Sequence, residues 1–166
     1  MKNYILLVGL ICANSNCFSQ NIIDTTKKVN VVHMPEYYKE KGVIFSEDYF
    51  VGIDMKGIKS RYTPTIDDLV KSEDIFSRKY NDIEKRNVVT RDFFCHWVRQ
   101  YVGLIDSTGN KNIIVQLIDN RKPRKINKLL GKNWEDVFTI MLADSFYKVS
   151  KIFRININTG EMSTDL

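Results

Sequence analysis

Thr63–Ile83 reads TPTIDDLVKSEDIFSRKYNDI, and this stretch decides the fold. Two start signals open it: a threonine before Pro64 at a first helical position, and the alternative capping box of Thr65 with Asp68. Apolar residues then recur every three or four positions, and Glu73 fills the one polar position of the stripe formed by Ile66, Leu69, Phe76, Tyr80 and Ile83. We therefore predict a helix over about residues 65–82 with one face ready for burial.

The segments that follow this helix have the composition of strands. Runs rich in β-branched and aromatic residues occupy Val88–Asp106, Asn112–Asp119, Val137–Leu142 and Phe146–Ile157. Turn residues separate them, and the first run is long enough to need a bend. One amphipathic helix and four antiparallel strands are best packed with the strands curled around the helix. The predicted fold is therefore α+β, with a curved four-stranded antiparallel sheet in the cystatin-like or NTF2-like arrangement.

Upstream of the helix, the chain divides into two further parts. Residues 20–61 are expected to form an extended leader with short strands at Val43–Phe45 and Tyr49–Ile53, and residues 62–166 form the helix-plus-sheet domain. Residues 1–19 have the composition of a signal peptide, with a positive start at Lys2, a short apolar run and small residues before the cleavage site. That run is too short to cross a bilayer.

A cleaved signal peptide predicts an exported protein, periplasmic or secreted. A soluble product is favoured because neither Cys12 nor Cys17 follows a good lipid-attachment motif; the alternative is a degenerate lipid-attachment site. Cleavage leaves one cysteine, Cys95, so the mature protein is expected to fold without an intrachain disulfide. The formal net charge of the whole chain is +5. This excess is compatible with an acidic partner without requiring one.

Three short segments resemble a family of small exported Bacteroidetes proteins that have no assigned activity. They are Tyr62–Thr65 opening a helix, Tyr101–Asp106 before a turn with glycine, and Asn133-Trp134 leading to a last strand that ends in Asn158–Glu161. The resemblance covers roughly residues 62–162 and implies export and a helix on a curved sheet. It implies no catalytic residue, and the loop at residues 143–146 lacks the glycines that are frequent in the family.

Glu73 is the first candidate site residue. If the sheet covers the apolar face of the helix, burial would raise the pKa of this carboxyl, and a pocket between helix and sheet would be lined by Glu73, Trp97 and Tyr101. Such a pocket would suit a small-ligand binder or an enzyme. The alternative is that Glu73 lies at the edge of the stripe, in solvent or paired with a cation such as Lys151.

A basic stretch is the second candidate. Residues 121–132 are expected to form a loop with no acidic residue, and its partner-binding candidates are Arg121, Lys122, Arg124, Lys125 and Lys128. Nucleic acid is not the expected partner, because the stretch lacks stacking aromatic residues and the protein is exported. An acidic protein or an anionic component of the envelope fits better. The alternative is a solvated loop without a partner.

Catalytic and metal motifs are weak in this chain. Cys95 and His96 would point to opposite faces of a strand, so we do not predict a cysteine nucleophile. His33 and Glu36 are separated by Pro35, which weakens a helical metal pair. No glycine-rich phosphate loop, serine elbow or zinc motif occurs. We therefore predict no cofactor and a non-catalytic binding protein, such as a periplasmic inhibitor or immunity-type protein.

Overall fold

The computed structural model describes residues 23–141 and 143–164. The predicted signal peptide, residues 1–19, lies outside the described residues. The elements of the described part follow one another as β1 (Val29–Val32), β2 (Gly42–Phe45), β3 (Ile58–Tyr62), α1 (Ile66–Glu84), α2 (Thr90–Phe94), β4 (Trp97–Asp106), β5 (Lys111–Asp119), α3 (Pro123–Leu130), the 3-10 helix η1 (Trp134–Asp136), α4 (Asp144–Tyr147), β6 (Ser150–Asn156) and β7 (Met162–Ser163).

The described strands form one mixed, open sheet of seven strands. Their order is β1-β2-β4-β5-β6-β7, and β3 also pairs with β4, beyond the end of β2. The β2–β4 pair is parallel, whereas the other pairs are antiparallel. The α+β class and the helix on the sheet are confirmed, but the predicted four-stranded antiparallel sheet is wrong. Residues 29–62 supply three strands of the same sheet, so they are not only a leader.

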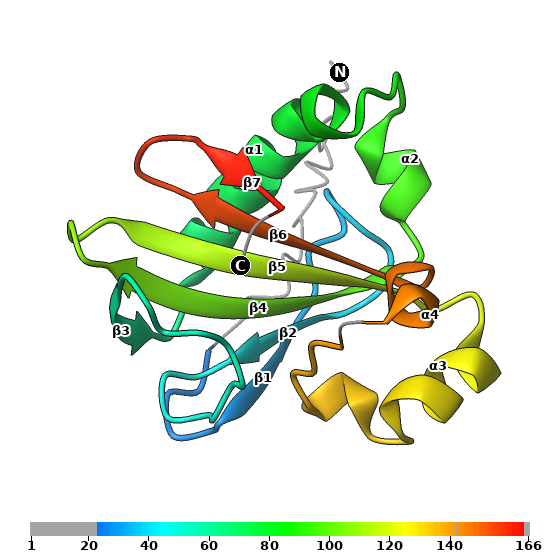
Figure 1. The fold of residues 1–166 in the computed structure, drawn as a ribbon, viewed down its shortest axis with the longest axis horizontal. Coiled ribbons are helices and arrows are strands. Elements are labelled where there is room, and N and C mark those ends of the chain that lie inside the picture. Colours follow the sequence, from blue (N-terminus) through cyan, green and yellow to red (C-terminus); the bar gives the residue numbers. More distant parts are fainter. Residues whose placement is uncertain (1–22, 142, 165–166) are drawn as a thin grey trace, which may run out of the picture.

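Helix α1 begins as the sequence predicts. Thr65 is the N-cap, and its side chain accepts from the Asp68 backbone N–H while the Asp68 carboxylate accepts from the Thr65 N–H. Both bonds of the capping box are thus present. The helix ends at Glu84, and its C-cap Lys85 has a left-handed φ of 51°. Figure 1 shows α1 crossing one face of the sheet, whereas α3 and α4 lie at the end where β4 begins and β5 stops.

The sheet is buried on both faces. On the α1 face, aromatic side chains from the helix meet the sheet, and the Phe76 ring lies 5.2 Å from the Phe153 ring, centroid to centroid. On the opposite face, residues of the β2–β3 loop and of the segment after η1 cover the sheet, with Phe45 packed against Phe138. Because both faces of the sheet are covered, the central strands are largely apolar on both sides.

Several predicted strands differ in the structure. The first strand run starts nine residues later than predicted, because residues 90–94 form helix α2 and residues 95–96 a turn. The predicted strands at Tyr49–Ile53 and, as far as the structure describes it, at Val137–Leu142 are irregular segments that pack on the sheet through apolar side chains. In each case the apolar composition was right and the backbone geometry wrong, because a short apolar run does not by itself distinguish a strand from a buried helical turn or a covering segment.

The close approach of β2 to β4 depends on Gly42. A Cβ at this position would lie 2.4 Å from the Tyr38 hydroxyl, 2.8 Å from a methyl of Val32 and 3.0 Å from the Tyr101 ring. All three neighbours are buried, so the site has little room to adjust.

We predict that Gly42→Ala lowers the free energy of unfolding by about 1–3 kcal/mol, as overpacking of a buried site typically does. Gly52→Ala is the matched control, because a Cβ there meets nothing within 4 Å. Urea unfolding measures both variants. Equal effects of the two substitutions would show that the β2–β4 approach tolerates a methyl group.

Asp106 ties the β4–β5 turn together. Its carboxylate accepts from the Thr108 hydroxyl at 2.6 Å, from the backbone N–H groups of Thr108 and Asn110 at 3.0 and 2.9 Å, and from the Asn112 amide at 3.1 Å. These hydrogen bonds lower the pKa of Asp106 to about 2, and the bond from the Thr108 hydroxyl has the largest effect.

This pKa predicts a pH dependence of stability. Since the folded-state pKa lies below the ordinary value of 3.8, ionised Asp106 stabilises the fold above that value, and this contribution is lost as the pH falls towards 2. In urea unfolding, the midpoint of the wild type should exceed that of Asp106→Asn at about pH 5, and the gap should close near about pH 2. A gap that stays constant over this range would contradict the assignment; exposed Asp82, as Asp82→Asn, is the control.

Candidate functional site

A buried ion pair joins helix α1 to the sheet. Glu73, in the middle of the helix, and Arg99, on β4, are each only 1% exposed, and the Arg99 Nε lies 3.6 Å from the Glu73 Oε1. Burying two charges costs several kcal/mol per ion unless further hydrogen bonds satisfy them. The Arg99 guanidinium donates to the carbonyls of Phe94 and Trp97 at 2.7 and 2.8 Å. The pair therefore also fixes the turn that links α2 to β4.

Two tyrosines complete the environment of this pair. The Tyr101 hydroxyl donates to the Glu73 carboxylate at 2.8 Å and lies 3.2 Å from the Tyr38 hydroxyl. The Arg99 guanidinium carbon lies 4.6 Å from the centroid of the Tyr38 ring, a cation–π geometry. Burial, reinforced by the nearby Glu73, raises the pKa of both Tyr38 and Tyr101. Both phenols are therefore neutral near pH 7 and can donate hydrogen bonds.

The predicted pocket residues Glu73, Trp97 and Tyr101 all face the space between α1 and the sheet. Glu73 does point inwards, and its cationic partner is Arg99, whereas Lys151 pairs with Glu84 at 3.6 Å. Trp97 stacks edge-on against Phe94, with ring centroids 5.1 Å apart. All three side chains are buried among neighbours in the core. Their contacts hold the helix on the sheet.

Surface pockets occur at other places in the described part of the chain. One of about 630 Å³ lies between the exposed side of α1 and the β6–β7 turn. A second, of about 700 Å³, lies beside Ile152 and Tyr147 near β6, and a third, of about 580 Å³, lies over polar residues at the ends of β4, β5 and β6. Glu73, Trp97 and Tyr101 line none of these three.

The basic stretch is a helix rather than the predicted loop. Residues 123–130 form α3, with Pro123 in its first turn and Gly131 directly after its end. Ile126 is fully buried, and it packs with Leu129 and Leu130 against a cluster formed by Val98, Ile118, Trp134 and Val149. The sequence does contain a helical signal here: a proline, apolar residues at i, i+3 and i+4, and a closing glycine. The loop was predicted instead because the stretch is rich in lysine and arginine.

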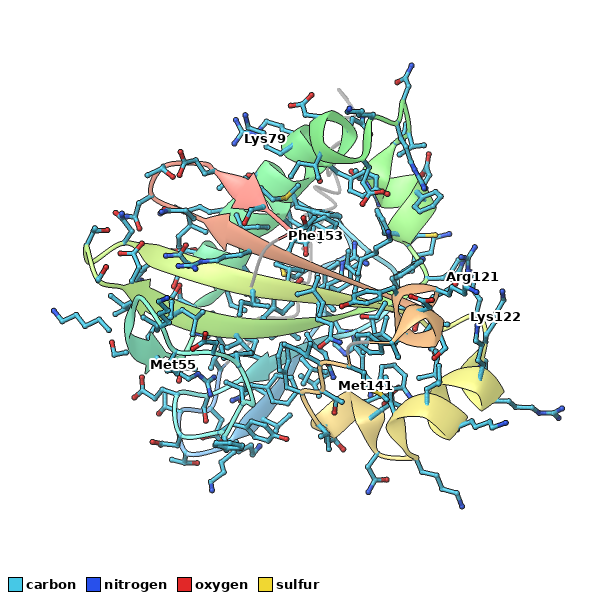
Figure 2. The ribbon with its side chains drawn as sticks, viewed as in Figure 1. Met55, Lys79, Arg121, Lys122, Met141 and Phe153 are labelled. Atoms are coloured by element: carbon cyan, nitrogen blue, oxygen red, sulfur yellow. The ribbon has the colours of Figure 1, made fainter. Side chains whose placement is uncertain are left out.

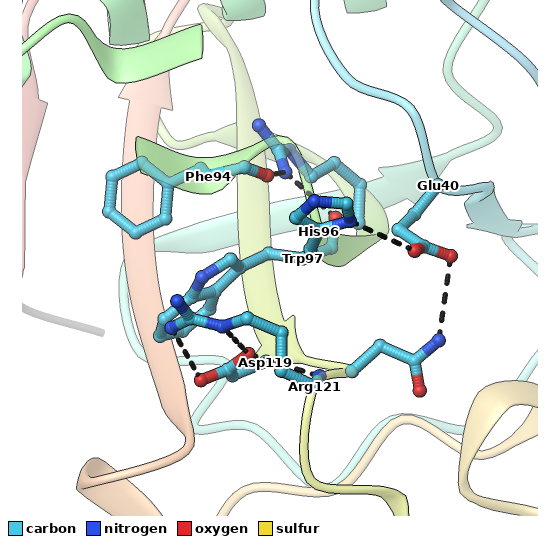
Figure 3. Close-up of polar contacts among 8 residues, drawn as sticks. Glu40, Phe94, His96, Trp97, Asp119 and Arg121 are labelled. Atoms are coloured by element: carbon cyan, nitrogen blue, oxygen red, sulfur yellow. Dashed lines mark hydrogen bonds and ion pairs between the residues drawn. The ribbon is translucent and has the colours of Figure 1, made fainter. Parts of the chain in front are cut away.

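Arg121 differs from the other predicted partner-binding residues. Its guanidinium donates from Nε to one Asp119 oxygen at 2.7 Å and from a terminal nitrogen to the other at 2.8 Å (Figure 3). Burial alone would raise the pKa of Asp119, but the bonds and charge of Arg121 outweigh burial and lower it. Arg121 is therefore committed to a two-bond ion pair within the chain.

The remaining cations form a surface that we call the α3 cationic face. Its members are exposed, and no carboxylate of the described residues lies within 4 Å of their charged groups; they are Lys122, Arg124, Lys125, Lys128 and Lys132. In Figure 2, Lys122 projects at the α3 end of the molecule, and Lys79 projects from α1 at a different side. The apolar side of α3 packs against the end of the sheet, with Ile126 buried and Leu129 and Leu130 partly buried, so the α3 cationic face is mainly charged.

A smaller polar group lies near Arg121. The His96 Nδ1 is 3.7 Å from a Glu40 carboxylate oxygen, and the Asn120 amide donates to the other oxygen at 3.4 Å (Figure 3). The adjacent Cys95 is a half-buried free thiol in a turn, so the predicted strand geometry of the Cys95–His96 pair is wrong. Within residues 23–141 and 143–164, no cluster of three or more metal-ligating side chains occurs.

Comparisons with known proteins add no function. No protein-family model, curated protein or solved structure matches this chain. The described helices include none that is both long and apolar enough to cross a membrane. The resemblance to small exported Bacteroidetes proteins accordingly stays a prediction.

We predict that Glu73→Ala lowers the free energy of unfolding by about 3–5 kcal/mol, because Arg99 would stay buried without its counter-charge. Replacing both partners, as Glu73→Leu with Arg99→Met, should recover part of this loss. Glu135→Ala is the control: it removes a half-exposed ion pair with Lys41, and about 1 kcal/mol or less is expected. Chemical unfolding measures all three. A loss for Glu73→Ala no greater than that of the control would contradict a stabilising role of the pair.

Proposed function

We propose that this protein is a small, exported, non-catalytic binding protein whose α3 cationic face holds an acidic protein partner. An inhibitor or immunity-type protein acting in the periplasm would work in this way. Kinship with the small exported Bacteroidetes proteins is part of the same proposal.

One observation carries the proposal. Five exposed cations, Lys122 to Lys132, project from one short helix and its ends without a carboxylate partner among the described residues. Like charges gathered on one element repel one another, and an anionic surface would relieve that repulsion. Cations that bind an acidic partner are expected to lack a carboxylate partner in the free protein.

The anchoring of α3 supports a specific surface rather than a flexible charged tail. Ile126, Leu129 and Leu130 dock the helix against the end of the sheet, so the cations have fixed starting positions. A fixed arrangement loses less conformational freedom on binding than a mobile loop does. Ile126 is buried and Leu129 and Leu130 are partly buried against the same cluster, so α3 offers little apolar surface to insert into a bilayer, which favours an acidic protein over a lipid surface.

The state of Glu73 favours this function over a pocket function. A general base or ligand anchor needs a route to solvent, whereas the Glu73 carboxylate is buried against Arg99 and Tyr101. These contacts support a role for Glu73 in stability.

The test is charge reversal on the α3 cationic face. Lys122, Arg124, Lys125 and Lys128 are all changed to Glu, and Arg121 is left in place because it pairs with Asp119. The wild type, used as bait on envelope extract, should retain an acidic protein in a 1:1 complex identified by mass spectrometry. The variant should bind that protein roughly a hundredfold more weakly, and the wild-type affinity should fall as salt rises.

A matched variant controls for net charge. Lys28, Lys59, Lys71 and Lys79 are exposed lysines away from α3, and their reversal to Glu changes the net charge by the same amount. This control should bind the partner within a few-fold of the wild type. If both variants lose binding equally, the interaction is non-specific; if neither does, the α3 cationic face is not the binding surface.

A further inference from the structure

Phe50 is the most exposed large apolar side chain of the described residues, at 88%. It lies in the β2–β3 loop, which Figure 1 shows apart from α3 and which reaches η1 through the hydrogen bond that the Tyr49 hydroxyl donates to the Asp136 carbonyl at 3.3 Å. The residues on either side of it are anchored: Val51 is buried, and the Tyr49 ring lies 4.7 Å from the Phe45 ring, centroid to centroid. The loop therefore binds to the core before and after Phe50 and turns this one aromatic ring outwards.

Arg61 fixes the backbone of this loop. Its guanidinium donates to the carbonyls of Ser46 at 2.9 Å and Phe45 at 3.2 Å, and also to that of Tyr49. The Tyr49 N–H closes a turn onto the Ser46 carbonyl at 3.1 Å. Three backbone carbonyls bound by one half-buried arginine restrain this end of the loop. Phe50 is thus presented on a pre-ordered support, which reduces the entropy lost when a partner binds it.

The exposed residues just before Phe50 are acidic, and the half-buried Arg61 adds a positive charge that interacts with Glu47. Glu47 and Asp48 are both exposed, and neither belongs to an ion pair within the described part of the chain. An anionic bilayer or a nucleic acid would repel these carboxylates. A protein surface with a cationic rim around an apolar pocket would complement both the ring and its neighbours.

We propose that Phe50 is the anchoring residue of a second interaction surface, which docks into an apolar pocket with a Lys/Arg rim on a protein partner. An exposed aromatic residue that becomes fully desolvated is the usual centre of such an interface. This surface is opposite in charge to the α3 cationic face and does not depend on it. It therefore needs a partner surface of the opposite charge to the one that the α3 cationic face would bind.

Site-specific photo-crosslinking of the full chain tests the proposal. Phe50 is replaced by p-benzoylphenylalanine, which keeps an aromatic ring at the exposed position, and the protein is irradiated in its native envelope. Val89, which is 65% exposed at the start of α2, takes the same residue as the control. The expected result is one protein adduct from position 50 that position 89 does not give.

Two variants then test the anchor and the acidic neighbours against the purified partner. Phe50→Ala should weaken binding about tenfold to a hundredfold, the range expected for burial of one large apolar side chain. Glu47→Lys with Asp48→Lys should weaken binding at least tenfold, whereas Glu36→Lys with Asp82→Lys, two exposed acids elsewhere, should leave it within a few-fold. Urea midpoints close to that of the wild type confirm that each variant is folded.

Several outcomes would overturn the proposal. These are no adduct from position 50, equal adducts from positions 50 and 89, an adduct with lipid, or an adduct with a second copy of this chain. Unchanged binding of the Phe50→Ala variant would also overturn it. Loss of binding in the α3 charge-reversal variant with retention of the position-50 adduct would instead show that the two surfaces act separately.

Discussion

The buried pair of Glu73 and Arg99 is the interaction on which the other parts of this structure depend. It connects the middle of α1 to the central strand β4, and the same guanidinium binds the carbonyls of Phe94 and Trp97 at the turn before that strand. Tyr38 and Tyr101 enclose the pair, and Gly42 allows β2 to approach them. One set of contacts therefore positions the helix, the turn and the parallel strand. Removing either Glu73 or Arg99 alone is expected to destabilise the fold, because the remaining charge would stay buried without a partner.

The helix could be predicted from the sequence because its signals are local. Thr65 and Asp68 are three residues apart, and the apolar residues of the stripe recur every three or four positions. The position of Glu73 on the stripe allowed an inward direction, but the sequence left open that it lay at the edge of the stripe. Its partner could not be predicted, because Arg99 lies far along the chain in a run that composition marks only as a strand. Likewise, the pairing of β2 with β4 depends on contacts between distant segments, which local patterns do not encode.

The two candidate surfaces show the same limit. The five cations of the α3 cationic face were visible in the sequence as a charged run. The apolar side of the helix that positions them became evident only from the packing of Ile126 with Trp134 and Val149. Arg121 was indistinguishable from its neighbours in sequence, and only the structure commits it to Asp119. Phe50 lies in a segment predicted as a strand, where an aromatic residue is ordinary. Arg61, which holds the backbone of the loop, is on β3, a strand that the composition did not reveal.

The parallel pairing of β2 with β4 has a consequence for the order in which the chain acquires its structure. β1 and β2 are synthesised early, but the strand that completes their hydrogen bonds arrives only after α1 and α2. Until then the β1–β2 hairpin has an open edge and an apolar surface without cover, and two strands alone are marginally stable in water. A chain of this topology is expected to fold slowly and to be most prone to aggregation before β4 emerges. During vectorial synthesis or transport, the part of this protein most in need of protection is therefore the hairpin that appears first.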